Sequence, residues 1–289
     1  MIRSCATKSV SVAARRRERV GDFRAMKTKP YESRSGFTLV ELLMVMLIAA
    51  VVMTGIFSVF RGQQRAHLVN SQTIEIQQNL RAGLYMMERD ARLAGYSPSA
   101  NTGATITEAT RTGFRFTWDD NEDGDVTDAG EDIAFGMGPT HDADNDGVAD
   151  DGLGALGRSQ DGGAFNPIAN NIQAVAFAYA YDDDLDKDLD PAGPDNTTWG
   201  YDSDDDGDLD TDIDGNPINP NIALDRIRAV RIWLLARSRR YIGGYEDNRT
   251  YNLPGMAVAG NGDPYLRRMM VSTIKCRNMG LRPQTAAAP

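Results

Sequence analysis

The sequence has few of the side chains that build zinc sites and disulfide frameworks. Its 289 residues include only two cysteines, Cys5 and Cys276, and two histidines, His67 and His141. Two cysteines cannot build a disulfide-rich scaffold, so cysteine usage says little about the compartment. The sequence also has no zinc-ligand set, phosphate-binding loop or G-x-S-x-G nucleophile elbow. Catalysis therefore has little support, and we expect a protein that is not an enzyme.

Basic residues are scarce beyond the N-terminal segment. Residues 1–36 contain ten basic and three acidic residues. The rest of the chain then has 21 basic and 38 acidic residues, a net charge of −17. So acidic a surface is a poor general binder of nucleic acid, and we expect no nucleic-acid partner. It suits a solvated extracytoplasmic surface or a cation-binding protein.

One long apolar run follows the basic segment. Residues 37–60 are apolar except for Thr38, Glu41, Thr54, Gly55 and Ser58. A run of about 20 apolar residues can cross a bilayer as a helix, and it is too long for the core of a secretory signal peptide. Because the basic residues precede it, we expect a cytoplasmic N-terminus and a C-terminal domain across the membrane. A carboxylate such as Glu41 costs roughly 2.5–3.5 kcal/mol at mid-bilayer, which predicts a function and a partner for it.

The start of the run, GFTLVELL at residues 36–43, resembles the type IV prepilin signature. Gly36 matches the last leader residue, Phe37 the first mature residue and Glu41 the acid at the fifth mature position. The resemblance implies that prepilin peptidase cuts between Gly36 and Phe37, and that Phe37 is N-methylated. It also implies that Glu41 acts in assembly by pairing with the N-terminal amine of a neighbouring subunit. The alternative is an ordinary signal anchor with a stray Glu.

A leader of 36 residues is long for this family. Met26 offers an alternative start that leaves a short basic leader ending at Gly36. We therefore expect that residues 1–25 are not part of the precursor.

An amphipathic pattern continues beyond the apolar run. Apolar or small side chains recur at three- and four-residue spacing, which predicts a helix with one apolar stripe: Val69, Thr73, Ile76, Leu80, Leu84, Met87, Ala91 and Ala94. Gly95 and Pro98 supply a stop. We predict one helix from about Phe37 to about Ala94, with a transmembrane half at residues 37–60 and an amphipathic half at 61–95.

After Gly95 the hydrophobic pattern changes to period two. Alternating segments occur at 114–118, 133–135, 175–181, 227–236 and 265–276, separated by Gly, Asn, Asp and Pro. They predict an α+β protein in which a mainly antiparallel sheet, within a β-rich domain at residues 96–281, packs on the second half of the helix. We expect Cys276 to be a packing residue and residues 282–289 to form a flexible tail.

Two further stretches, 78–96 and 267–281, are similar to PilW-type minor pilins and, more loosely, to J-type pseudopilins of type II secretion. The resemblance covers residues 36–96 and 227–281. It implies a pilin-like fold, an inner-membrane precursor and later incorporation into a pilus at the cell surface. The implied partners are other pilins, which bind through the N-terminal helix, and prepilin peptidase.

The middle of the chain is strongly acidic. Residues 119–225 contain about 30 Asp and Glu residues and two basic residues. Three segments, at 119–128, 142–153 and 202–214, follow a D-x-[DN]-x-D-G pattern, and alternating acids at 182–190 form a weaker fourth. Alternate carboxylates in a tight loop suit calcium, a hard cation with six to eight oxygen ligands. The predicted ligands are Asp119, Asn121, Asp123, Asp125, Asp142, Asp144, Asp146, Asp150, Asp202, Asp204, Asp206, Asp208 and Asp210.

These loops depart from the EF-hand pattern. Gly130, Leu153 and Ile213 stand at the twelfth position, where an EF-hand has Glu. A solvated acidic loop without a metal is therefore the alternative interpretation.

The sequence supports three functions. The first is a structural minor pilin of a type IV pilus that takes part in assembly, priming or the tip complex. The second is a type II secretion pseudopilin, which shares every N-terminal feature. The third, from another class, is a membrane-anchored, calcium-dependent adhesin or binding module.

Overall fold

A computed structural model describes residues 36–98, 102–182, 191–192, 196–197 and 199–280. The predicted leader before Gly36, the alternative start at Met26 and the predicted tail at 282–289 lie outside these ranges, as do residues 183–190 of the fourth acidic segment. The chain divides into two compact units, Met1–Ile56 and Phe57–Pro289.

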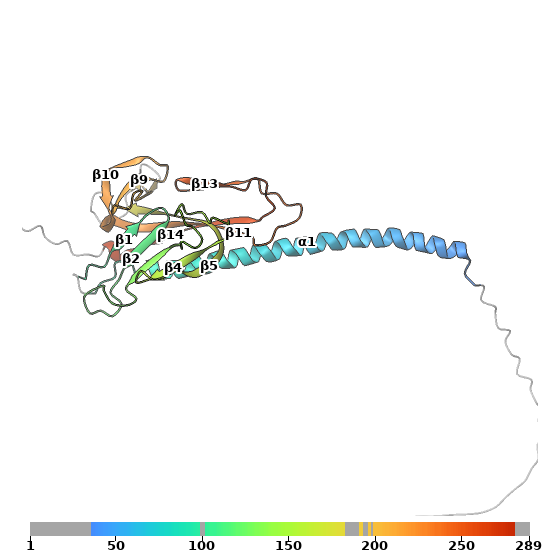
Figure 1. Cartoon of the computed structure of the whole chain (residues 1–289), viewed down its shortest axis with the longest axis horizontal. Helices are drawn as coiled ribbons and strands as arrows, with labels where there is room; N and C mark the ends of the chain where they lie inside the picture. The colour runs from blue at the N-terminus through green and yellow to red at the C-terminus, as the bar shows by residue number, and fades with distance from the viewer. Residues whose placement is uncertain (1–35, 99–101, 183–190, 193–195, 198, 281–289) are drawn as a thin grey trace, which may run out of the picture. The chain divides into compact units, whose positions relative to one another are not determined.

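Helix α1 spans Leu39–Ala91 (Figure 1). Its predicted start at Phe37 is two residues too early, because Thr38 acts as the N-cap and its hydroxyl accepts the backbone N–H of Glu41 at 3.2 Å. Its predicted end at Ala94 is three residues too late. Turns follow Ala91, and Gly95 has a φ of +73°, the left-handed conformation that often ends a helix.

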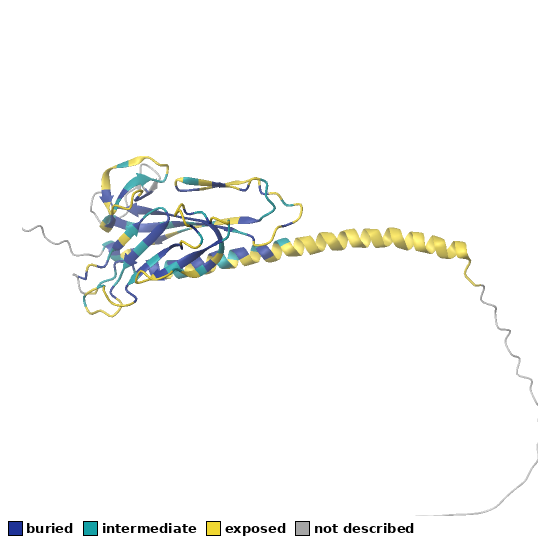
Figure 2. Ribbon diagram, in the orientation of Figure 1, coloured by how far each residue is buried: buried dark blue, intermediate teal, exposed yellow. Residues whose placement is uncertain are grey.

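The first part of α1 exposes its apolar side chains. Every large apolar side chain between Phe37 and Phe60 is between 51% and 82% exposed, and Figure 2 colours this stretch as exposed throughout. Within the described residues, α1 alone is long and apolar enough to cross a membrane. Water does not stabilise such a surface, because each exposed apolar side chain forfeits about 1.5–3 kcal/mol of burial energy.

The second part of α1 packs against the sheet through the predicted stripe. Ile76, Leu80, Leu84, Met87, Ala91 and Ala94 are buried, and Val69 is partly buried against the same core. The helix also buries Gln72, Gly83 and Asp90, which the apolar pattern did not indicate. At Gly83 a Cβ atom would lie 2.7 Å from the Cβ of Ala169, so this position lets the helix approach the sheet closely.

The main sheet has ten strands among the described residues, with the order β1-β2-β3-β4-β5-β8-β9-β10, and β11 joins β5 to β14. Every pair of named strands is antiparallel. The strands of this sheet are β1 (Ile106–Ala109), β2 (Gly113–Thr117), β3 (Asp132–Met137), β4 (Gly154–Gln160), β5 (Asn166–Tyr181), β8 (Trp199–Tyr201), β9 (Asp208–Asp212), β10 (Pro217–Ala223), β11 (Ile227–Arg237) and β14 (Arg267–Lys275). Two small hairpins pair β12 (Thr250–Leu253) with β13 (Met256–Ala259) and β6 (Pro191–Ala192) with β7 (Asn196–Thr197). The helix and the antiparallel sheet confirm the predicted α+β class.

Strand β5 is buried on both faces. Val175, Phe177 and Tyr179 belong to the main core, which also contains the buried stripe of α1. The intervening alanines face the other side, where Ala174 and Ala176 pack beneath the β12–β13 hairpin and Ala178 and Ala180 pack with Trp199. Small side chains on that face leave room for these covering segments.

The five predicted strand segments correspond to β2, β3, β5, β11 and β14. In the main sheet the pattern missed β1, β4 and β8 to β10, and it also missed both small hairpins. One of these corrects a prediction, because β9 lies inside the predicted loop 202–214 and contains Asp208 and Asp210. Acidic residues have low strand propensity, but β9 pairs with β8 and β10 and buries Leu209 in the main core.

Candidate functional site

The predicted processing site lies at an open position before α1. Gly36 and Phe37 are exposed, and a Cβ atom added at Gly36 would have no neighbour within 4 Å. Glu41 is exposed in the first turn of α1, where the helix dipole favours a carboxylate. This arrangement gives a peptidase access to the predicted cleavage bond, and cleavage, methylation and the assembly role of Glu41 stay predictions.

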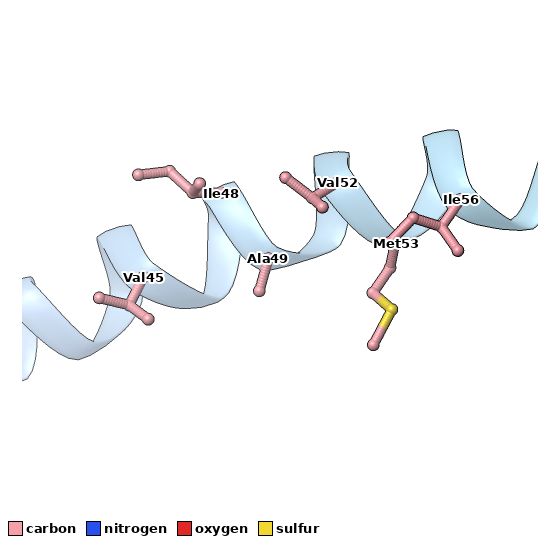
Figure 3. Close-up of a pocket in the computed structure, with 6 residues that line it drawn as sticks. All are labelled: Val45, Ile48, Ala49, Val52, Met53 and Ile56. Carbon is pink, nitrogen blue, oxygen red and sulfur yellow. The ribbon is translucent and has the colours of Figure 1, made fainter.

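A continuous apolar stripe runs along the first part of α1. Figure 3 shows six of its side chains projecting from successive turns, and no polar atom stands among them: Val45, Ile48, Ala49, Val52, Met53 and Ile56. Their spacing of three and one residues places them on one side of the helix. Lipid chains or the apolar side of another helix could cover this stripe.

The three acidic loops share one set of hydrogen bonds. In each, the first Asp is buried and its Oδ2 accepts the N–H of the glycine five residues later: Gly124 to Asp119 at 3.3 Å, Gly147 to Asp142 at 2.8 Å and Gly207 to Asp202 at 2.9 Å. In each, Oδ1 of the fifth-position Asp accepts the N–H two residues later: Asp125 to Asp123, Val148 to Asp146 and Asp208 to Asp206.

The loops also share their backbone conformation. The fourth residue has a positive φ in all three, at 62° for Glu122, 54° for Asn145 and 60° for Asp205. The sixth is a glycine with a φ of 100°, 83° and 97° respectively. The glycine of the pattern is therefore needed, because a side chain there would be strained. A repeated sequence pattern has produced a repeated loop.

A closing carboxylate completes each loop by accepting the N–H of the second residue. Asp150 accepts from Ala143 at 3.0 Å and Asp210 from Ser203 at 2.9 Å, and both acids stand at the ninth position. In the first loop this acid is Glu131, whose Oε1 accepts from Asp120 at 3.0 Å. Glu131 was not predicted from the sequence, because it stands at the thirteenth position, four residues later than its counterparts.

The second and third loops each bring three carboxylates together. One oxygen from each of Asp142, Asp144 and Asp146 lies within 4.8 Å of the others, and Asp202, Asp204 and Asp206 are arranged in the same way. Burial raises the pKa of the Asp142 carboxyl, and burial followed by repulsion from Asp206 raises the pKa of Asp204. These clusters could hold a cation.

Two more predicted ligands, Asn121 and Asp125, have partners within the first loop. The Asn121 amide donates to Asp123 at 3.1 Å and to Asp128 at 2.6 Å, and Asp125 accepts the hydroxyl of Thr127 at 2.8 Å. In the fourth segment, Asp182 is buried and pairs with Arg228 at 2.9 Å, which gives this acid a structural partner.

The structure also places the cysteine, the two histidines and a tryptophan that the sequence singled out. Cys276 is buried in the main core, which confirms it as a packing residue, and burial raises the pKa of its thiol to about 12. His67 is exposed on α1, and His141 is half-buried beside the second loop. Trp118 anchors the first loop by donating its indole N–H to the carbonyl of Gly130 at 2.9 Å.

Comparison with known proteins gives two family matches. Residues 154–278, from β4 through β14, match the family described as type IV pilus-assembly protein W, PilW. Residues 33–57 match the prokaryotic N-terminal methylation motif, which points to membrane anchoring by the apolar helix. The first two acidic loops lie outside both matches.

Comparison with individual proteins finds only distant similarity. No curated protein matches the chain significantly. A type IV-like pilin from Thermus thermophilus is similar in structure at 15% identity, with a TM-score of 0.40, over 71% of this chain and 97% of that one. On its two family matches, the chain is a PilW-like, type IV pilin-like protein with an N-terminal methylation motif and a PilW domain.

Proposed function

We propose that the protein is a structural minor pilin of a type IV pilus, which takes part in priming or in the tip complex. The observation that carries this proposal is the combination of a methylation motif on an exposed apolar helix with a PilW domain in the same chain. The precursor sits in the inner membrane with its N-terminus in the cytoplasm and its domain in the periplasm. Prepilin peptidase cuts it after Gly36, and Phe37 is N-methylated. The PilW match supports a pilus over a type II secretion system.

Glu41 guides docking in this proposal. After cleavage the amine of Phe37 is a cation at the helix N-terminus, and Glu41 lies about one turn away. Both charges are costly in lipid unless they are paired. A neighbouring subunit offers the complementary pair through its own N-terminus, so the pairing favours insertion in one register. The apolar stripe of Figure 3 then packs among the helices of the neighbouring pilins.

The test is Glu41→Ala in the native host, with Glu75→Ala as the matched control. Both acids are exposed on α1, but Glu75 lies beyond the apolar run. We expect Glu41→Ala to be cleaved normally and to fall at least tenfold in sheared fibres, while Glu75→Ala is incorporated like the wild type. Equal abundance of both variants in fibres would remove the role assigned to Glu41.

The proposed role is structural and not enzymatic. The matched families are pilins, and the acidic residues are too numerous to single out a catalytic pair. A second candidate function is calcium-dependent adhesion, favoured by the exposed carboxylates of the second and third loops. It would require binding of the full-length protein to cells or polymers that depends on calcium and is lost in chelator.

A further inference from the structure

We propose that the first acidic loop, residues 119–131, is a calcium site closed by Glu131. This inference concerns the β-rich domain and does not depend on the proposed function. It rests on the Asp119 carboxylate. One of its oxygens lacks the hydrogen bond that the corresponding oxygen accepts in each of the other two loops.

Asp119 is fully buried and has one oxygen without a partner. Its Oδ2 accepts the N–H of Gly124 at 3.3 Å, but its Oδ1 has no hydrogen-bond partner among the described residues and no solvent contact. In the second loop the corresponding Oδ1, on Asp142, accepts the N–H of Asp146 at 3.0 Å. In the third, on Asp202, it accepts the N–H of Asp205 at 2.7 Å. A buried, unpaired carboxylate oxygen is costly, and a bound cation would remove that cost.

The same loop carries further oxygen donors. Asn121 and Asp123 stand at alternate positions of the same turn, and Glu131 closes the loop. The side chain of Glu131 is only 1% exposed, and its two oxygens accept the backbone N–H groups of Asp120 at 3.0 Å and Asp128 at 3.1 Å. These bonds hold the carboxylate in place and leave it further lone pairs for a metal.

The donor set selects calcium over other divalent ions. It contains carboxylate and amide oxygens and neither nitrogen nor sulfur ligands, which disfavours zinc. A long irregular loop with several carboxylates suits the flexible coordination of calcium better than the strict octahedron of magnesium.

The loop connects three parts of the domain. It joins β2 to β3, and the N–H of Asp119 donates to the carbonyl of Tyr96 in the segment after α1 at 2.9 Å. The Tyr96 hydroxyl donates to Glu122 at 3.1 Å within the loop. Calcium at this position would therefore stiffen the junction between the end of α1 and the sheet edge formed by β2 and β3.

Trp118 provides a readout for this loop through the part of the emission that depends on its indole. Its indole donates to Gly130, so it lies beside the proposed site. Terbium replaces calcium at oxygen sites and emits when a nearby indole is excited. The experiment uses the full chain in detergent micelles, stripped with EDTA and titrated with terbium. Calcium or magnesium is then added as competitor, and calorimetry with calcium alone runs in parallel.

The variants distinguish binding at a defined set of ligands from nonspecific attraction of cations to an acidic surface. Asp119→Asn and Glu131→Gln keep the shape of each side chain and remove one charge. Asp120→Asn removes the same charge at the adjacent exposed position and is the matched control. Trp118→Phe should remove the part of the sensitised emission that comes from this loop, while calorimetric calcium binding persists. Thermal melting in EDTA checks folding, and there Asp119→Asn should be at least as stable as the wild type.

We expect calcium, but not magnesium at equal concentration, to displace terbium from the wild type. We expect Asp119→Asn and Glu131→Gln to weaken the Trp118-sensitised site at least tenfold and Asp120→Asn to change it less than twofold. The proposal is overturned if the wild type shows no sensitised emission or if Trp118→Phe leaves that emission unchanged. It is also overturned if Asp120→Asn weakens binding as much as Asp119→Asn, because the loop would then attract cations only through its net charge.

Discussion

The two parts of α1 differ in where their apolar side chains find partners. In the second part, Leu80 and Met87 are fully buried against the sheet of the same chain. In the first, Leu47 is 63% exposed and its neighbours are similar. Both parts form regular helix, so backbone preference does not distinguish them. The second part obtains its burial within the domain, whereas the first requires lipid or another protein.

The largest expected effect comes from the same substitution made in each part. Leu80→Ala should lower the free energy of unfolding of the domain by about 2–5 kcal/mol, because it leaves a cavity in the core. Leu47→Ala should change it by less than about 0.5 kcal/mol, since Leu47 is 63% exposed and its removal leaves no cavity in the core. Urea unfolding in micelles, followed by tryptophan fluorescence, measures this directly, because Trp118, Trp199 and Trp233 all lie in the domain. A comparable loss in both variants would contradict the comparison.

A smaller effect is expected from the ion pair that joins α1 to the sheet. Arg158 on β4 contacts Asp90 at 2.7 Å, and the Asp90 side chain is only 6% exposed. Arg158→Met would leave Asp90 with Arg89, whose side chain is 62% exposed. We expect a loss of about 1–3 kcal/mol, less than for a fully buried pair because Arg158 is partly exposed.

The double variant Asp90→Asn with Arg158→Met is the control for this pair. It removes the buried charge together with its partner, so it should cost less than Arg158→Met alone. If both variants lose the same stability, the pair is not what holds Asp90 in the interface.

The smallest effect should appear in the dependence of domain stability on pH. Hydrogen bonds from Arg267, at 2.6 and 2.5 Å, lower the pKa of the Asp263 carboxyl below its usual value. A lowered pKa contributes stability above about pH 4, and this contribution is lost as pH falls through the folded-state pKa. Asp263→Asn should therefore cost about 1 kcal/mol at pH 7 and flatten the loss of stability below pH 4.

Urea titrations of the domain between pH 3 and pH 7, with EDTA present throughout, test this prediction. Asp161→Asn is the control, since among the described residues the Asp161 carboxylate accepts a single backbone N–H, from Gly130 at 3.0 Å. A parallel pH profile for Asp263→Asn and the wild type would argue against the assigned role of the Arg267 contact.

The helix and the central strands could be predicted because the spacing of their apolar residues matches the positions that are buried. Ile76, Leu80, Leu84 and Met87 repeat at helical spacing and are buried, as the pattern indicates. Strand β5 alternates large side chains with alanines, and each set meets its own core cluster. Asp90 could not be found in this way, because its burial depends on Arg158, 68 residues later in the chain.

The acidic loops could be predicted in part. Their glycine and alternating acids gave the position of each turn, because that conformation depends on local sequence. The closing acid of the first loop could not be assigned, since four additional residues separate Glu131 from the position of its counterparts. Strand β9 was also missed, because its pairing with β8 and β10 overrides the low strand propensity of its acidic residues.

The central claim is that the chain is a processed pilin whose mature N-terminus is Phe37, two residues before α1 begins. The most direct test is the intact mass and N-terminal sequence of the protein from membranes and sheared fibres of the native host. We predict a chain that begins with N-methylated Phe37. Gly36→Val, which meets no neighbouring atom within 4 Å and so should not disturb the fold, is predicted to stay uncut. A wild-type chain that retains Gly36, or begins at any other residue, would contradict the account.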